Sequence, residues 1–171
     1  MRELWLLRHA KSAWNSDAPT DFERPLNKRG RSDAPRLGNW MKRRGLVPDG
    51  VFSSDAVRAR QTAQRLLRGL AIESLKICYD HGLYLASRGD LVAFVQTLPS
   101  CFQRPLIIGH NPGLDELVEF LCGPRLPLTD DGKLMTTASL ACIGVSGEWP
   151  DLQPGGGTLR ELTRVRDLPA R

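Results

Sequence analysis

The stretch 4-LWLLRHAKSAWN-15 changes abruptly from apolar to polar residues. Its first part, residues 4–7, is short and continuously apolar, which is typical of a strand buried on both faces of a largely parallel sheet. Arg8 and His9 follow at once, so they should lie at the carboxyl end of that strand. Open α/β sheets bind their ligands at this end. The stretch therefore predicts a central strand that presents Arg8 and His9 to a ligand.

Further apolar runs with the patterns of strands and helices alternate along the chain. Residues 51–52, 75–79 and 106–108 are expected to form strands of the same buried kind. In residues 91–98 and 114–121 the apolar residues recur at i, i+3, i+4 and i+7, the spacing of a one-sided helix. This alternation of strands and helices predicts an α/β fold.

Polar residues mark the starts of these two helices. Ser87 followed by Asp90 resembles a capping box, in which each side chain bonds the other's backbone N–H. Asn111 followed by Pro112 resembles an N-cap with proline at the first helical position. A helix is therefore expected to begin right after His110.

Two other regions have less regular patterns. Residues 27–45 have a helical pattern, but Pro35 lies inside it and should kink or interrupt the helix. Residues 134–145 and 158–165 are β-rich, and a stretch rich in Gly and Pro, 147–157, separates them. These two segments are expected to pair antiparallel near an edge of the sheet.

The length and composition indicate one domain, residues 1–171. The apolar fraction of 41% and the charged fraction of 25% are those of soluble globular proteins. No apolar run approaches the roughly 20 residues of a membrane helix or the roughly 7 to 15 of a signal-peptide core. The four cysteines, at positions 78, 101, 122 and 142, form no C-x-x-C pair, which argues against a zinc knuckle or a redox motif. We expect them to be buried thiols of a cytoplasmic protein.

The charge of the chain leaves two readings open. It has 24 Lys and Arg against 19 Asp and Glu, a net charge of +5 and a pI near 9.3. This balance fits an anionic partner, and it fits an ordinary solvated basic surface equally well. The cluster 42–44 suits the last turn of a helix, where cations complement the helix dipole. No basic motif interleaved with aromatic residues accompanies it, so a nucleic-acid partner is not expected.

Two more segments repeat the pattern of a strand followed by a cationic or histidine side chain. In 53-SSDAVRARQTA-63, Arg58 lies just beyond a strand, at the start of a helix. In 106-LIIGHNPG-113, His110 follows a strand and precedes a helix whose free N–H groups suit an anion. Arginine recognises phosphate with two parallel hydrogen bonds, and a histidine nitrogen such as that of His9 is a nucleophile. Three strand ends are thus predicted to converge on phosphate chemistry.

In this order, the motifs resemble those of the histidine phosphatase (phosphoglycerate mutase-like) superfamily. The matching residues are Arg8-His9 with Ser12 and Trp14-Asn15, Arg58-Ala59 with Thr62, and Gly109-His110. Within that superfamily, the small size and three further stretches look most like the phosphohistidine phosphatase SixA subgroup. These stretches are 8-RHAK-11, 21-DFERPLNKRG-30 and 109-GHNPG-113.

The resemblance implies a three-layer α/β/α sandwich around a largely parallel central sheet. His9 would attack phosphorus and carry a phosphohistidine intermediate, while Arg8, Arg58 and His110 would surround the phosphoryl oxygens. No metal or other cofactor would be required. Asn15 would donate a hydrogen bond to His9 or to the phosphate, unless it is only a polar loop residue. Ser12 would act similarly.

The resemblance leaves the acid that protonates the leaving group unassigned. Mutase-like relatives use a Glu after the third strand, where this chain has Asp80, His81 and Gly82. We therefore nominate Asp80 first and His81 second. A phosphoramidate nitrogen is readily protonated, so such a leaving group would make a strong acid less necessary. The replacement of Gly-Glu by Ala10-Lys11 after His9 also argues against mutase activity.

The sequence leaves alternatives for the roles of two further arginines and for the identity of the substrate. Arg24 and Arg29 would either guide an anionic substrate or form structural salt bridges. The leading function is removal of phosphate from phosphohistidine on proteins, because the short chain lacks the long insertions of larger relatives. The alternatives are a phosphatase of a small sugar or nucleotide phosphate and a phospho-ligand-binding module without turnover. The partner would be a phosphorylated protein or a small phosphorylated metabolite. No association with a membrane is expected, and the sequence does not indicate an oligomeric state.

Overall fold

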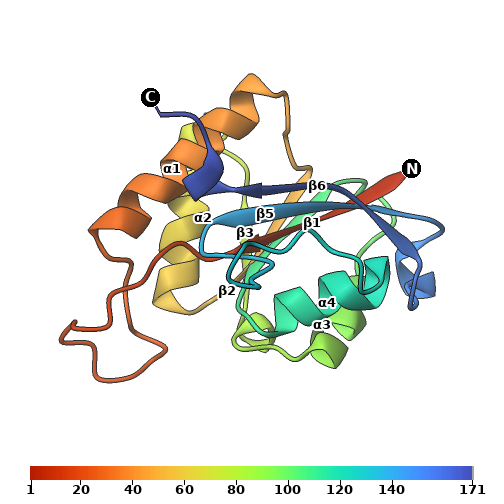
Figure 1. The fold of residues 1–171 in the computed structure, drawn as a ribbon, viewed down its shortest axis with the longest axis horizontal. Helices are drawn as coiled ribbons and strands as arrows, with labels where there is room; N and C mark the ends of the chain where they lie inside the picture. The colour runs from red at the N-terminus through yellow and green to blue at the C-terminus, as the bar shows by residue number, and fades with distance from the viewer. Residues whose placement is uncertain (171) are drawn as a thin grey trace.

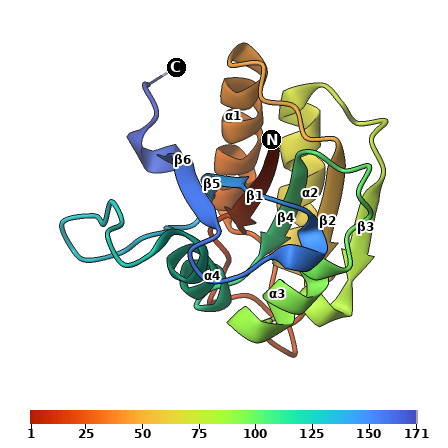
Figure 2. The ribbon, with the colours of Figure 1, turned by 90° about the vertical axis from the view of Figure 1, so that its right-hand side faces the viewer.

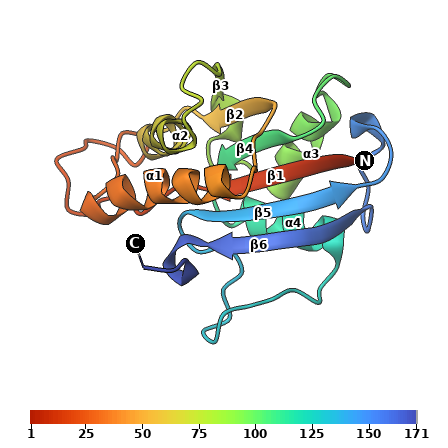
Figure 3. The ribbon, with the colours of Figure 1, turned by 90° about the horizontal axis from the view of Figure 1, so that it is seen from above.

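The computed structural model of the chain describes residues 1–170, and the strands form one mixed sheet. The sheet has the order β3-β2-β4-β1-β5-β6, which Figure 3 shows from above. The strands are β1 (Arg2–Arg8), β2 (Gly50–Ser54), β3 (Ile77–Asp80), β4 (Pro105–Gly109), β5 (Ser139–Val145) and β6 (Gly157–Arg164).

Four of these strands run parallel, as the buried apolar runs predicted. β1 pairs with β4, β4 with β2 and β2 with β3, all in parallel. β5 is antiparallel to β1 and to β6, so the expected antiparallel pair lies at one edge of the sheet. The first residues of the predicted segment 134–145 are not part of a strand, since β5 begins only at Ser139.

The prediction that 75–79 is buried on both faces is wrong. β3 starts at Ile77, and its residues alternate between half-buried and exposed. The reason is its position, because β3 is an edge strand with β2 as its only neighbour in the sheet.

Helices cover both faces of the sheet and complete the expected three-layer α/β/α sandwich. Figures 1 and 2 show one pair of helices on one face and the second pair on the other. The first pair is α1 (Lys28–Arg43) and α2 (Val57–Leu70), and the second is α3 (Arg88–Gln96) and α4 (Gly113–Cys122).

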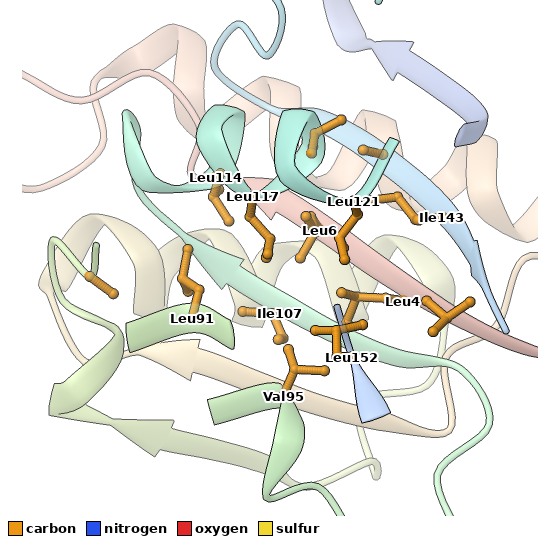
Figure 4. Close-up of a cluster of buried hydrophobic side chains, with 14 of the residues drawn as sticks. Leu4, Leu6, Leu91, Val95, Ile107, Leu114, Leu117, Leu121, Ile143 and Leu152 are labelled. Atoms are coloured by element: carbon orange, nitrogen blue, oxygen red, sulfur yellow. The ribbon is translucent and has the colours of Figure 1, made fainter. Parts of the chain in front are cut away.

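The alternation of side chains along β1 divides the apolar core in two. Leu4 and Leu6 belong to the cluster under α3 and α4, together with Ile107 of β4 (Figure 4). Trp5 and Leu7 point to the opposite face and pack with the apolar residues of α1 and α2. All four β1 side chains are fully buried, which places the strand at the centre of the molecule.

The predicted break at Pro35 does not occur. α1 runs through it from Lys28 to Arg43, and Asn27 caps the start by accepting the Gly30 N–H at 2.9 Å. Close packing of α2 supports this part of the helix, because a Cβ at Gly69 would lie 2.3 Å from the Pro35 carbonyl oxygen. Glycine at position 69 therefore lets the two helices approach.

The starts of α3 and α4 agree only in part with the sequence patterns. The capping box between Ser87 and Asp90 is present. α4 starts at Gly113, not right after His110. Residues 110–112 make a turn first, and the Asn111 side chain accepts the Asp115 N–H at 3.2 Å across it.

The cysteines are free thiols, but they are not all buried. Cys142 is buried and Cys122 half-buried, as expected, whereas Cys78 and Cys101 are exposed. Cys78 lies on the edge strand β3, and Cys101 lies in the loop before β4. Within residues 1–170, no helix has the length and apolar character needed to cross a membrane.

Candidate active site

A cavity of about 360 Å³ lies where the carboxyl ends of β1 and β4 meet the start of α2. We call it the His9 pocket. It receives residues from all three motifs and from the long segment between β1 and α1, which extends from the end of β1 in Figure 1. Its lining residues are Arg8, His9, Lys11, Ser12, Trp14, Asp21, Arg24, Arg58, Leu85, His110, Asn111 and Thr137.

The imidazole of His9 is buried and held in one orientation. Its Nδ1 lies 2.7 Å from the carbonyl oxygen of Ala10. A carbonyl only accepts, so Nδ1 carries the proton and Nε2 keeps its lone pair. Burial, supported by the nearby charges, lowers the pKa of His9 to about 3. At neutral pH His9 is therefore an uncharged imidazole with a nucleophilic Nε2.

His110 lies beside His9, with 5.2 Å between the ring centroids. Its Nε2 is 2.8 Å from Ser54 Oγ. Ser54 Oγ also accepts the Ala56 N–H, so this contact fixes the orientation of the His110 ring and leaves Nδ1 as its other nitrogen. This Nδ1 is buried and has no hydrogen-bond partner in residues 1–170.

Three guanidinium groups line the same pocket. Arg8 donates to the Met135 carbonyl oxygen at 2.9 Å, and Arg58 is 2% exposed. The Nε atoms of Arg8, Arg24 and Arg58 are buried without a partner in the described part of the chain, like Nδ1 of His110. Buried donors without partners are costly unless a ligand or water satisfies them. Their presence in one cavity makes it a candidate anion-binding site.

Asp21 is a central residue of this site that the sequence reasoning did not single out. Its carboxylate accepts from Arg24 and from Arg58, each at 3.0 Å, and from the Tyr84 hydroxyl at 2.5 Å. The hydrogen bond from Tyr84, followed by those from Arg24 and Arg58, lowers the pKa of Asp21 well below its usual value. Asp21 is therefore ionised at neutral pH, and it is the one carboxylate among the pocket-lining residues of the described chain.

Buried side chains tie the first two motifs together. Thr62 Oγ1 accepts the Ala10 N–H at 3.0 Å and donates to the Arg58 carbonyl oxygen at 2.7 Å. Ser12, predicted as a substrate ligand, lines the pocket, and its hydroxyl accepts from Arg24. The loop after His9 also packs closely on the start of α1, because a Cβ at Gly30 would lie 2.1 Å from the Lys11 carbonyl oxygen.

The structure does not bring Asn15, Asp80 and His81 into the pocket lining. Asn15 is exposed. Asp80 lines a different depression and caps a short 3₁₀ turn by accepting the Gly82 N–H at 2.7 Å. The imidazole of His81 is exposed and bonds Asp55 at 3.0 Å.

Arg24 and Arg29, for which the sequence left two roles open, have different positions in the structure. Arg24 lines the pocket and also forms a salt bridge with Asp21 at 3.0 Å. Arg29 lies outside it and pairs with Asp33 at 3.3 Å on the surface of α1. The salt-bridge alternative thus describes Arg29, while Arg24 forms a salt bridge and also lines the pocket.

The lowered pKa values predict a loss of stability in acid. The folded-state pKa values of His9 and His110 are both about 3, against 6.5 for an ordinary histidine. The unfolded chain therefore binds more protons below pH 6.5, and stability falls as the pH drops from there toward 3. Between about pH 7 and about pH 5, each histidine should cost about 2 kcal/mol of unfolding free energy. Urea titration measures this change, and His110→Gln should remove about half of it; an unaltered pH dependence would contradict the burial of a neutral His110.

Comparison with known proteins agrees with this geometry. The sequence model of the histidine phosphatase superfamily (branch 1) matches residues 4–84. An uncharacterised Mycobacterium tuberculosis protein is 31% identical over 157 residues, covering 90% of this chain and 96% of that protein. An uncharacterised chloroplastic Arabidopsis thaliana protein is 30% identical over 171 residues, covering 94% and 77%. The chain belongs to the histidine phosphatase superfamily.

Solved structures of histidine phosphatases have the same fold. A candidate phosphohistidine phosphatase SixA from Agrobacterium tumefaciens has a TM-score of 0.76 and 26% identity, covering 95% of this chain and 97% of that one. A protein histidine phosphatase SixA complexed with tungstate has a TM-score of 0.79 and 24% identity, covering 98% and 99%. This histidine phosphatase is thus SixA-like, and the family supports a phosphatase activity.

Proposed function

We propose that this histidine phosphatase removes phosphate from phosphohistidine on proteins, through a phosphoryl group carried transiently on His9. The observation that carries the proposal is the His9 pocket itself. A neutral imidazole with its Nε2 lone pair available lies among Arg8, Arg24, Arg58 and His110. This arrangement combines a nucleophile with hydrogen-bond donors for the charge on a phosphoryl group in transfer.

The proposed reaction has two steps. The other ring nitrogen of the phosphohistidine first takes up a proton from the solvent. His9 Nε2 then attacks phosphorus, the bond from phosphorus to the substrate nitrogen breaks, and the electron pair leaves with a neutral imidazole. A water oxygen then attacks phosphorus, and the electron pair of the broken bond returns to Nε2. One water proton passes to the solvent or to the phosphate. Throughout, the Ala10 carbonyl oxygen keeps the other His9 proton on Nδ1.

Asp21 supports a P–N bond over a P–O bond as the target. An alkoxide leaving group needs an acid, but the Asp21 carboxylate is held ionised by Tyr84, Arg24 and Arg58. An ionised carboxylate has no proton to give at neutral pH. The free ring nitrogen of phosphohistidine is readily protonated by the solvent, so its departure needs no acid from the enzyme, and this pocket suits it better than an alkyl phosphate.

One relative of the chain acts on a small molecule, which supports the small-molecule alternative. A 2,3-bisphosphoglycerate-dependent phosphoglycerate mutase from Bartonella bacilliformis is 35% identical over 92 residues, covering 53% of this chain and 45% of that enzyme. The matched part is compatible with a phosphomonoester substrate. We propose the protein substrate because the Asp21 carboxylate in the pocket offers no acid.

The decisive experiment is a turnover panel at matched concentrations. A phosphohistidine peptide should exceed sugar and nucleotide monophosphates in kcat/KM by at least about tenfold, which corresponds to about 1.4 kcal/mol of transition-state stabilisation. Faster hydrolysis of any of the monoesters would replace the proposed function with the small-molecule alternative. No turnover of either class, with binding retained, would point to a phospho-ligand-binding module.

We also propose that the reaction is independent of metal ions, because the guanidinium groups of Arg8, Arg24 and Arg58 supply the positive charge. Turnover is expected to survive treatment with EDTA and to be inhibited by vanadate, which imitates the phosphoryl group in transfer. Initial rates before and after chelation test this. Complete loss of activity on chelation, restored by a divalent metal, would indicate a metallophosphatase instead.

A further inference from the structure

Two large apolar side chains stand exposed in a pocket otherwise lined mostly by polar and charged groups. Trp14 is 75% exposed and Leu85 is 55% exposed, and both line the His9 pocket. The other exposed large apolar residues among positions 1–170 are Met1, Val47 and Leu128, and none of them lines it. We call Trp14 and Leu85 the apolar rim.

Trp14 is held at the pocket by its neighbours. The Arg24 guanidinium lies over its ring, 3.8 Å from the ring centroid. The backbone just before it is anchored, because the Ala13 N–H donates to the Pro25 carbonyl oxygen at 2.8 Å. Arg24 is itself bonded to the carboxylate of Asp21. The indole is thus attached to the anion-binding groups, with most of its surface open.

Leu85 reaches the pocket from a strained backbone position. Its φ is +49°, in the left-handed region that is unfavourable for a bulky residue. Both neighbours hold it there, since the Tyr84 hydroxyl bonds Asp21 and Ala86 is buried. Strained residues cluster at sites that bind ligands. A strained and exposed leucine in the lining of the His9 pocket fits such a role.

We propose that the apolar rim is the subsite for the ring of the leaving group and selects phosphoryl groups attached to a flat heteroaromatic ring. This inference rests on the proposed function and adds the residues that choose the leaving group. With the phosphoryl group bound among the arginines, the rest of the substrate must extend along the remaining lining of the same cavity. An imidazole ring would bury its faces against Trp14 and Leu85. A hydroxylated sugar would bring polar groups that the Leu85 side chain cannot bond.

The test uses four small compounds that separate bond type from ring. Phosphoimidazole and phosphoramidate both have a P–N bond, and only the first has a ring; phenyl phosphate and methyl phosphate form the same pair with a P–O bond. The measured quantity is the kcat/KM ratio of the ring compound to its ringless partner. Trp14→Ala should lower this ratio by about tenfold for each bond type, since stacking contributes on the order of that factor. Trp14→Phe should restore most of it.

The role of Leu85 is tested with a replacement residue that can adopt the same left-handed backbone conformation. Leu85→Asn keeps a residue that adopts the left-handed conformation and removes the apolar side chain. It should lower the ring ratio several-fold, chiefly through KM. Leu128→Ala is the matched control, because Leu128 is 56% exposed and lies outside the pocket. The control ratio should stay at the wild-type value.

The outcomes separate this inference from the proposed function. If the kcat/KM ratio of ring to ringless compound stays at the wild-type value in Trp14→Ala and Leu85→Asn, the proposed role of the apolar rim is wrong. An equal fall with Leu128→Ala would overturn it as well. Preference for P–O over P–N compounds in the wild type would overturn the phosphohistidine proposal. Even in that case, the kcat/KM ratios of ring to ringless compounds would still test the role of the apolar rim independently.

Discussion

Replacing His9 with alanine is expected to reduce turnover by roughly 10⁴-fold or more, the largest effect of any single change proposed for this chain. The variant lacks the nitrogen that forms the bond to phosphorus, and no other lining group replaces it. His110 is oriented by Ser54 and is assigned to the phosphoryl oxygens. The fold should survive, because the apolar core does not depend on the His9 side chain.

Two measurements check this expectation. Mass spectrometry of wild-type samples quenched without acid should find the phosphoryl group on His9. His81→Ala is the matched control, because the His81 ring is exposed and outside the pocket, and its turnover should stay close to the wild type. Robust turnover by folded His9→Ala protein would refute the nucleophile assignment.

Arg58→Met is expected to lower kcat/KM by roughly 10² to 10³-fold, the range found when one donor to a developing negative charge is removed. Arg58 is 2% exposed, and the guanidinium Nη atoms bond Asp21 at 2.8 and 3.0 Å. Methionine fills a similar volume without the charge. Asp21 keeps its bonds to Arg24 and Tyr84, so the pocket should remain assembled.

The same helix offers a control for charge alone. Arg60 is exposed and stacks on Tyr79, 4.5 Å from the ring centroid, away from the pocket. Arg60→Met should therefore leave kcat/KM within about twofold, as surface changes usually do. Vanadate inhibition should weaken in Arg58→Met and not in Arg60→Met. Equal effects in both variants would mean that Arg58 acts only through net charge.

The sequence predicted His9, Arg58 and His110 because each follows a buried apolar strand. The carboxyl ends of parallel strands meet at one edge of a sheet, so residues far apart in the chain converge. This convergence does not include three other predicted site residues, Asn15, Asp80 and His81, which lie outside the pocket lining. Asp80 ends β3, the edge strand, and its carboxylate turns to the backbone of the next 3₁₀ turn.

Asp21 was missed for a related reason. It lies in the segment between β1 and α1, where no periodic pattern indicates which way a side chain points. The available signal was its position three residues before Arg24, the spacing of the salt bridge that the structure contains. That spacing alone predicts a local pair. Only the folded chain brings Arg58 and Tyr84 to the same carboxylate.

The amino-acid sequence by itself therefore determined the α/β class, the parallel strands and the residues at their ends, because periodicity and strand order are local properties. The tertiary structure decided which polar groups share the His9 pocket, the proton position on His9, and the ionised state of Asp21. It also decided that Trp14 and Leu85 stand exposed beside them. These properties depend on burial and on contacts between distant segments, and neither exists until the chain is folded.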